Sequence, residues 1–271
     1  MRDADAPDRS HIACFRRALS RAWLSVVLTA GSAFAQESGQ VVFVLAGQSN
    51  MVGRGVSAEL PPELLQIPAN VQYFLDGELT RFSEQEHFGP EVGFAHELAR
   101  AWPERQVVLI KYAVGATSLL AWAPAWDSAA AAITHNAAAG PLYQHLMNIV
   151  SSVPLQAEAE FAGVLWMQGE RDAFFPAAGA EYLTHLRTLV QRLRIDFGQP
   201  NLPFILGQVN PPPARWAAED LVREAQRAAQ SHISRTGLVL TDDLPKLEDD
   251  VHYNTLGQLE LGRRLPGLIW I

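Results

Sequence analysis

The stretch VVFVLAGQSNM, residues 41–51, joins a buried strand to a turn that carries a serine. Residues 41–46 form a short, continuous apolar run that ends at Gly47, which is typical of a parallel strand covered on both faces. A serine at such a strand-to-helix turn can expose its hydroxyl at the edge of the sheet, and its N–H can face a developing oxyanion. Ser49 is therefore a candidate nucleophile. The alternative interpretation is a helix N-cap serine.

The rest of the chain repeats this alternation of strand and helix. We predict further buried strands at 107–112, 161–167, 204–209 and 237–240, and helices at 93–101, 141–150, 178–197, 221–231 and 256–268. Alternation of this kind predicts an α/β fold with a mainly parallel sheet and helices on both faces. Ligands of such sheets bind beyond the carboxyl ends of the strands, so the residues that follow each strand are the candidates for a site.

Two of these strand ends carry residues suited to stabilising charge. Gly115 follows the second strand and offers an N–H with no side chain in the way, although it could equally be an ordinary turn glycine. Gln168 follows the third strand and could donate a side-chain N–H to an oxyanion, while Glu170 and Asp172 could position loops or substrate hydroxyls. The alternative for this third block is a polar turn that caps the next segment.

A histidine with nearby acids precedes the last predicted helix. Asp249 and His252 are three residues apart, so one tight turn can place the carboxylate against the imidazole. The other ring nitrogen is then free to take a serine proton. Asp250 competes with Asp249 for this role, and a solvated acidic turn is the alternative for the whole segment.

The N-terminal segment predicts export. Arginines precede a short apolar core, and Ala33-Phe34-Ala35 matches a small-x-small cleavage pattern. We therefore predict a signal peptide over residues 1–35 and a single domain over 36–271, in a periplasmic or extracellular protein. The apolar core is shorter than the ~20 residues that a membrane-spanning helix needs, so no stable membrane insertion is expected after cleavage.

Charge and cysteine content narrow the possible functions. The formal net charge of −8 becomes −10 without residues 1–35, which carry five arginines and three aspartates. An acidic protein is a poor candidate for binding nucleic acid. The single cysteine, Cys14, lies in the predicted signal peptide, so the mature chain would have no disulfide and no cysteine nucleophile. We predict no metal site and no cofactor.

Taken together, these blocks resemble the SGNH hydrolase superfamily. The resemblance is closest to its sialate O-acetylesterase-like branch, which includes the family-six carbohydrate esterases and acetylxylan esterases. It rests on residues 47–51, Gly115, the block 166–170, and Asp249 with His252, and it extends from about residue 41 to 265. The segments 88–95 and 115–122 also fit that branch.

The resemblance implies a three-layer α/β/α sandwich with a flavodoxin-like, mainly parallel sheet, here of five strands. It implies Ser49 as nucleophile, His252 as general base and Asp249 behind it. The oxyanion hole would consist of the N–H groups of Ser49 and Gly115 and the side chain of Gln168, where the wider superfamily has asparagine.

The implied activity is release of acetate from acetylated carbohydrate without a cofactor. Candidate substrate-binding or supporting residues are Gln48, Asn50, Glu91, Trp122 and Glu170. Two alternatives stay open: an esterase acting on lipid or aryl esters, and a carbohydrate-binding protein without catalysis. The sequence makes no prediction of the glycan or the oligomeric state.

Overall fold

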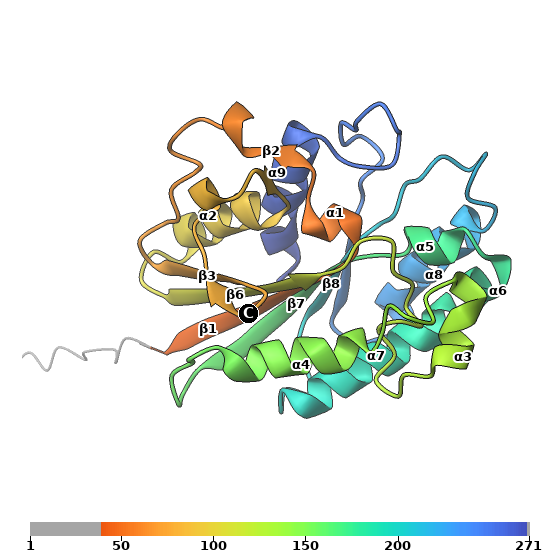
Figure 1. Cartoon of the computed structure of the whole chain (residues 1–271). Coiled ribbons are helices and arrows are strands. Elements are labelled where there is room, and N and C mark those ends of the chain that lie inside the picture. The colour runs from red at the N-terminus through yellow and green to blue at the C-terminus, as the bar shows by residue number, and fades with distance from the viewer. Residues whose placement is uncertain (1–38, 270–271) are drawn as a thin grey trace, which may run out of the picture. The chain divides into compact units, whose positions relative to one another are not determined.

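The computed structural model describes residues 39–269, so the predicted signal peptide lies outside the described residues. A seven-stranded sheet forms the centre of the described chain (Figure 1). Its strands, in spatial order, are β4 (Glu78–Leu79), β3 (Val71–Leu75), β6 (Gln106–Ala113), β1 (Gln40–Gly47), β7 (Glu160–Met167), β8 (Phe204–Gly207) and β9 (Thr236–Val239).

The five predicted strands are confirmed as β1, β6, β7, β8 and β9. They are all parallel, and in space they stand in the order second, first, third, fourth, fifth, which is the flavodoxin-like order. The predicted number of strands is wrong, because β3 and β4 extend the sheet beyond β6. Gln72 interrupts the apolar run of β3, and this polar residue concealed the strand. The missed signal is the dipeptide Asp76-Gly77, whose positive φ angles of 52° and 90° form the hairpin turn.

Helices cover both faces of the sheet and make the predicted three-layer sandwich. One face carries α2 (Glu91–Ala101) and α9 (Thr255–Arg264), and the other carries α4 (Leu142–Ser152), α7 (Tyr182–Asp196) and α8 (Glu219–His232) (Figure 1). The helix predicted over 178–197 is two helices, because α6 (Pro176–Ala180) ends before α7 begins.

Short elements fill the connections. A small antiparallel sheet pairs β2 (Gly55–Val56) with β5 (His87–Phe88). The remaining helices are α1 (Ser49–Val52), α3 (Ser128–Ala131) and α5 (Glu170–Ala173), with 3-10 turns η1 (Ser57–Glu59), η2 (Phe82–Glu84), η3 (Ala132–Thr134) and η4 (Leu265–Leu268).

The first strand is buried along its whole length. All eight residues of β1 are buried, because strands flank it on both sides and helices cover both faces. Phe43 of this strand contacts Phe94 of α2 edge-on and stacks on Trp102, with ring centroids 5.2 and 5.9 Å apart. Burial of each large apolar side chain stabilises the fold by about 1.5–3 kcal/mol. The carboxyl end of β1 is therefore held rigidly.

The order of the sheet reverses at β1, and three strands end there at the same level. Gly47 is in register with Ala113 of β6 on one side and with Met167 of β7 on the other. Gly47 has φ 147°, and a Cβ at this position would lie 2.1 Å from the Met167 carbonyl oxygen. Only glycine lets the chain turn so close to β7. The turns that follow β1, β6 and β7 consequently surround one crevice.

Candidate active site

Ser49 stands at the first residue of α1, directly beyond β1. A hydrogen bond to the end of β7 fixes this turn, because the Gln48 N–H donates to the Met167 carbonyl at 2.8 Å. Gln48, not Ser49, occupies the N-cap position of this short helix. The interpretation of Ser49 as a helix cap is therefore wrong, and its hydroxyl is available for another partner.

That partner is His252, which lies 203 residues away in the sequence. Ser49 Oγ and His252 Nε2 are 2.9 Å apart, and His252 Nδ1 is 2.6 Å from Asp249 Oδ2. The hydrogen bond to the carboxylate holds the proton on Nδ1, which leaves Nε2 as the acceptor that faces the serine hydroxyl. The three side chains have the geometry of a serine–histidine–aspartate triad.

The turn that carries His252 is built around the Asp249 carboxylate. Its Oδ1 accepts hydrogen bonds from the N–H groups of Val251 and His252, each at 2.9 Å. Burial raises the pKa of Asp249, but the hydrogen bonds from His252 and Val251 outweigh burial and lower it to about 2. Asp250 has φ 58°, in the left-handed region, and supplies the tight bend. Asp249 thus makes the contact to the imidazole, and Asp250 shapes the turn.

Asn50 joins the serine turn to the histidine turn. Its Nδ2 donates to Glu170 Oε1 at 2.7 Å and to the Val251 carbonyl at 3.1 Å, while its Oδ1 accepts from the Tyr253 N–H at 3.1 Å. Asn50 and Glu170 are both buried. A fully satisfied polar side chain of this kind fixes the relative position of the segments that it bonds.

Two backbone N–H groups are free to receive an oxyanion. Within residues 39–269, neither the Ser49 N–H nor the Gly115 N–H donates to a protein acceptor. Gly115 lies in the turn after β6, and a Cβ built on it would be 3.8 Å from Ser49 Cβ, so the two turns are in contact. Both predicted backbone donors are therefore near the Ser49 side chain.

Gln168 differs from its predicted role. Its Nε2 donates to the Thr117 carbonyl at 2.9 Å and to the Asp172 carboxylate, so both amide hydrogens are used. The side chain is completely buried and does not line the pocket at Ser49. In this conformation Gln168 holds the loop after β6 and has no hydrogen left for an oxyanion.

Two further candidates support the fold without contacting the pocket. Trp122 is fully buried, packs edge-on against Trp166 and donates from Nε1 to Thr117 Oγ1 at 3.1 Å. Glu91 forms an ion pair with Lys111 at 2.7 Å in the interior. Neither residue lines the pocket at Ser49.

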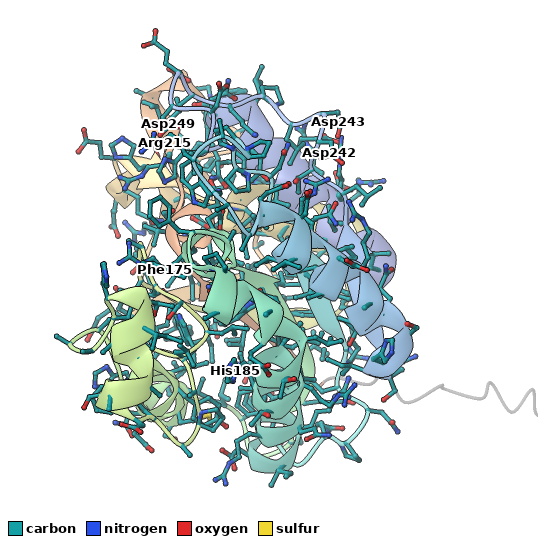
Figure 2. The ribbon with its side chains drawn as sticks, turned by 90° about the vertical axis from the view of Figure 1, so that its right-hand side faces the viewer. Phe175, His185, Arg215, Asp242, Asp243 and Asp249 are labelled. Atoms are coloured by element: carbon teal, nitrogen blue, oxygen red, sulfur yellow. The ribbon has the colours of Figure 1, made fainter. Side chains whose placement is uncertain are left out.

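A pocket of about 370 Å³ opens beside Ser49. Its lining includes Gln48, Ser49, Gly115, Glu170, Arg171 and His252, and also residues that the sequence did not single out: Arg54, Ala116, Phe174, Arg215, Trp216 and Val251. Figure 2 shows Arg215 and Asp249 at the same end of the molecule.

Two arginines in this lining, Arg54 and Arg215, were not predicted from the sequence. The third is Arg171, which follows Glu170 in the chain and by sequence could form an ion pair with it or contact substrate. It forms no ion pair with Glu170: Arg171 Nε donates to the Thr134 carbonyl at 2.8 Å, and its guanidinium lies over the Phe175 ring. Arg215 stacks on Trp216, with 5.0 Å between its guanidinium carbon and the ring centroid. Arg54 and Arg215 are exposed loop residues with no periodic pattern, so no sequence signal marks them.

The described residues contain no cluster of three or more histidine, cysteine or acidic side chains that could hold a metal ion. Among the same residues, no helix is both long and apolar enough to cross a membrane.

Comparison with known proteins identifies the family of this chain. A family model described as "carbohydrate esterase, sialic acid-specific acetylesterase" matches residues 39–270, and the chain belongs to this family. It is accordingly an enzyme, a carboxylic ester hydrolase. The sequence is 26% identical over 248 residues to a probable carbohydrate esterase of Arabidopsis thaliana, with 83% of this chain and 88% of that protein covered.

Solved structures share the fold. A protein from Arabidopsis thaliana superposes with a TM-score of 0.70 at 22% identity, covering 85% of this chain and 98% of the other. A carbohydrate acetylesterase from Xanthomonas citri gives 0.66 at 20% identity, over 84% of this chain and 55% of that one. NanS gives 0.62 at 15% identity, over 85% and 97%.

Proposed function

We propose that this chain releases acetate from acetylated carbohydrate through an acetyl-serine intermediate on Ser49. Ser49 Oγ attacks the carbonyl carbon of the ester while His252 Nε2 takes the hydroxyl proton. The oxyanion that forms accepts hydrogen bonds from the N–H groups of Ser49 and Gly115. When the tetrahedral intermediate collapses, the bond between the carbonyl carbon and the sugar oxygen breaks, and His252 returns the proton to that oxygen.

The second half of the reaction uses the same groups. Water attacks the acetyl carbon of acetyl-Ser49 and gives a proton to His252. The bond to Ser49 Oγ then breaks and His252 returns its proton to the serine oxygen, while acetic acid leaves and ionises in solution to acetate and a proton. Asp249 stays ionised throughout, orients the imidazole and stabilises the imidazolium.

One observation carries this proposal: the unbroken chain of hydrogen bonds from Ser49 through His252 to Asp249. A carbohydrate-binding protein without catalysis would have no need of a serine hydroxyl 2.9 Å from an imidazole nitrogen. The aromatic residues Phe174 and Trp216 line the same pocket. They suit a sugar ring, since aromatic faces pack well against apolar C–H surfaces.

The arginines of the pocket favour an acidic sugar among the possible substrates. Arg54 and Arg215 have no ion-pair partner among residues 39–269, and with Arg171 they give the pocket a local positive charge within an acidic chain. Guanidinium groups match the geometry of a carboxylate. The family description names sialic acid, which carries a carboxylate, and we propose an acetylated acidic sugar as the preferred substrate.

The location of the enzyme follows from the N-terminal segment. We propose that it is exported to the periplasm or the medium, where acetylated glycans are accessible, once residues 1–35 are removed. N-terminal sequencing of the mature protein tests this; a chain that keeps residues 1–35 would contradict it.

The direct test of the mechanism is Ser49→Ala, assayed with an aryl acetate and with acetylated sugars. Loss of the nucleophile should reduce kcat by about 10⁴-fold or more. A folded variant, judged by an unchanged circular dichroism spectrum, that keeps its turnover would overturn the assignment of Ser49.

A further inference from the structure

The Glu170 carboxyl group has one oxygen that the protein leaves without a partner. Its Oε1 accepts a hydrogen bond from Asn50 Nδ2 at 2.7 Å. Its Oε2 is buried and has no hydrogen-bond partner among the described residues. The whole residue is only 3% exposed, yet it lines the pocket that contains Ser49 and His252. A residue that lines the pocket thus has a buried carboxyl oxygen whose capacity to accept a hydrogen bond is unfilled.

An oxygen in this position is costly unless a ligand satisfies it. A buried polar atom without a partner destabilises a protein by about 1–3 kcal/mol, and more if it is charged. Burial also raises the pKa of Glu170, although the hydrogen bonds from its own N–H and from Asn50 oppose the effect. Such a group persists at a functional site when substrate binding supplies the missing hydrogen bond.

The chemistry of the pocket restricts what that ligand can be. An ionised carboxylate only accepts hydrogen bonds, whereas a protonated one donates through Oε2. A hydroxyl group can do both, so it pairs with Glu170 in either state. A cationic ligand would also suit a carboxylate, but Arg54, Arg171 and Arg215 in the same pocket would repel it.

We propose that Glu170 Oε2 binds a free hydroxyl group on the sugar ring that carries the acetyl ester, and that it thereby determines specificity. This inference rests on the proposed function. Asn50 follows Ser49 directly in the chain and bonds the other oxygen of Glu170, so the two oxygens and the nucleophile are held in one fixed arrangement. The enzyme would then prefer partly acetylated sugars, in which hydroxyls remain free, to fully acetylated ones.

The test compares substrates that differ by one hydroxyl. A methyl glycoside monoacetate, its series of monodeoxy analogues and an aryl acetate without hydroxyls are assayed with the wild-type enzyme. One deoxy analogue should have a kcat/KM about 10- to 100-fold below that of the parent, which is the effect expected from one hydrogen bond to a charged group. In Glu170→Ala, the kcat/KM values for the parent and for this analogue should agree within about threefold.

Two variants distinguish loss of the contact to the substrate hydroxyl from a general structural disturbance. Glu170→Gln keeps an oxygen for Asn50 but replaces the carboxylate with a neutral amide, so the discrimination should shrink to below about fivefold. Asp172→Asn alters a buried carboxyl group of the same turn that does not line the pocket. It should therefore change kcat/KM for the parent and for the deoxy analogue by the same factor.

Three outcomes would overturn the inference. The wild-type enzyme could show no discrimination among the deoxy analogues, or Glu170→Ala could keep the wild-type discrimination. Glu170→Ala could also lower turnover of the aryl acetate as much as that of the sugar, which would point to a role in positioning water or Ser49. The proposed function fails separately, if the wild-type enzyme releases acetate from none of the esters.

Discussion

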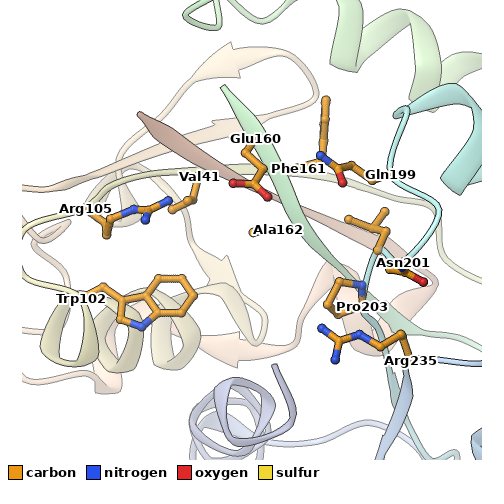
Figure 3. A pocket seen from close by; sticks show the side chains of 11 residues that line it. Val41, Trp102, Arg105, Glu160, Phe161, Ala162, Gln199, Asn201, Pro203 and Arg235 are labelled. Atoms are coloured by element: carbon orange, nitrogen blue, oxygen red, sulfur yellow. The ribbon is translucent and has the colours of Figure 1, made fainter. Parts of the chain in front are cut away.

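Two pockets of equal volume lie at opposite ends of the central strands of the sheet. Each has a volume of about 370 Å³. The pocket at Ser49 lies where β1, β6 and β7 end, and the other lies where β1 and β7 begin, with Val41, Trp102, Glu160 and Arg235 in its lining (Figure 3). We call the second one the strand-start pocket.

The two pockets differ in how their polar side chains are held. In the pocket at Ser49, hydrogen bonds connect Ser49, His252, Asp249 and Asn50 across about 200 residues of sequence. The strand-start pocket also has acidic and basic side chains, Glu160 and Arg105, but its lining contains no serine and no histidine. Volume alone therefore does not identify a site. The carboxyl ends of the strands do, because turns from several strands converge there.

The largest expected difference between the pockets comes from changing one acid in each. Asp249→Asn keeps the shape of the side chain but lets His252 adopt the wrong tautomer, so kcat should fall by about 10⁴-fold. Glu160→Gln makes the same chemical change in the strand-start pocket and should leave kcat/KM within about twofold. Steady-state kinetics with an aryl acetate provides the measurement. Similar losses in both variants would remove the distinction between the pockets.

A smaller effect on kcat/KM is expected from the arginines that line the pocket at Ser49 and not the strand-start pocket. Arg215→Ala should lower kcat/KM for an acetylated acidic sugar by about three- to tenfold, since partly exposed ion pairs contribute modestly. It should change kcat/KM for the neutral analogue by less than about twofold. Arg235→Ala is the control in the strand-start pocket. Equal losses on acidic and neutral sugars would contradict a carboxylate contact.

The smallest effect concerns the pH dependence of protein stability that comes from Asp172, which is buried behind the pocket at Ser49 and does not line it. Burial raises the pKa of Asp172 to about 7, against the hydrogen bonds from Gln168 and the Leu119 N–H. Between about pH 4 and pH 7 the folded state therefore binds a proton that the unfolded state has released, so the contribution of Asp172 to stability decreases as pH rises.

The variant Asp172→Asn removes this titration. The difference in midpoint of thermal unfolding between variant and wild type should accordingly shift in favour of the variant as pH increases through that range. A difference that stays constant from pH 4 to 7 would show that Asp172 titrates normally in the folded protein.

The sequence predicted the parts of this molecule that follow a regular pattern. The five buried strands are continuous apolar runs, and Ser49, Gly115 and His252 were found because each stands at a strand end or in a recognisable short block. The edge strand β3 was missed, because Gln72 breaks its apolar pattern. The arginines at 54 and 215 were missed because exposed loop residues show no periodicity, and their position depends on how distant loops fold together.

The polar interior was the least predictable part. Gln168 and Trp122 were expected near the substrate, but each is buried and bonded to Thr117. Glu91 pairs with Lys111, which is 20 residues away and on a different element. A sequence shows that a polar residue follows a strand, but it does not show which way the side chain turns. That choice depends on partners that only the folded chain brings together.

Covalent labelling tests whether Ser49 is a nucleophile activated by His252. The purified enzyme is treated with a fluorophosphonate, and the modified peptide is located by mass spectrometry, with His252→Ala and Ser49→Ala alongside. We expect one adduct on Ser49 in the wild-type enzyme, much slower labelling in His252→Ala, and no labelling in Ser49→Ala. An adduct on another residue, or no adduct in an enzyme that hydrolyses acetyl esters, would contradict it.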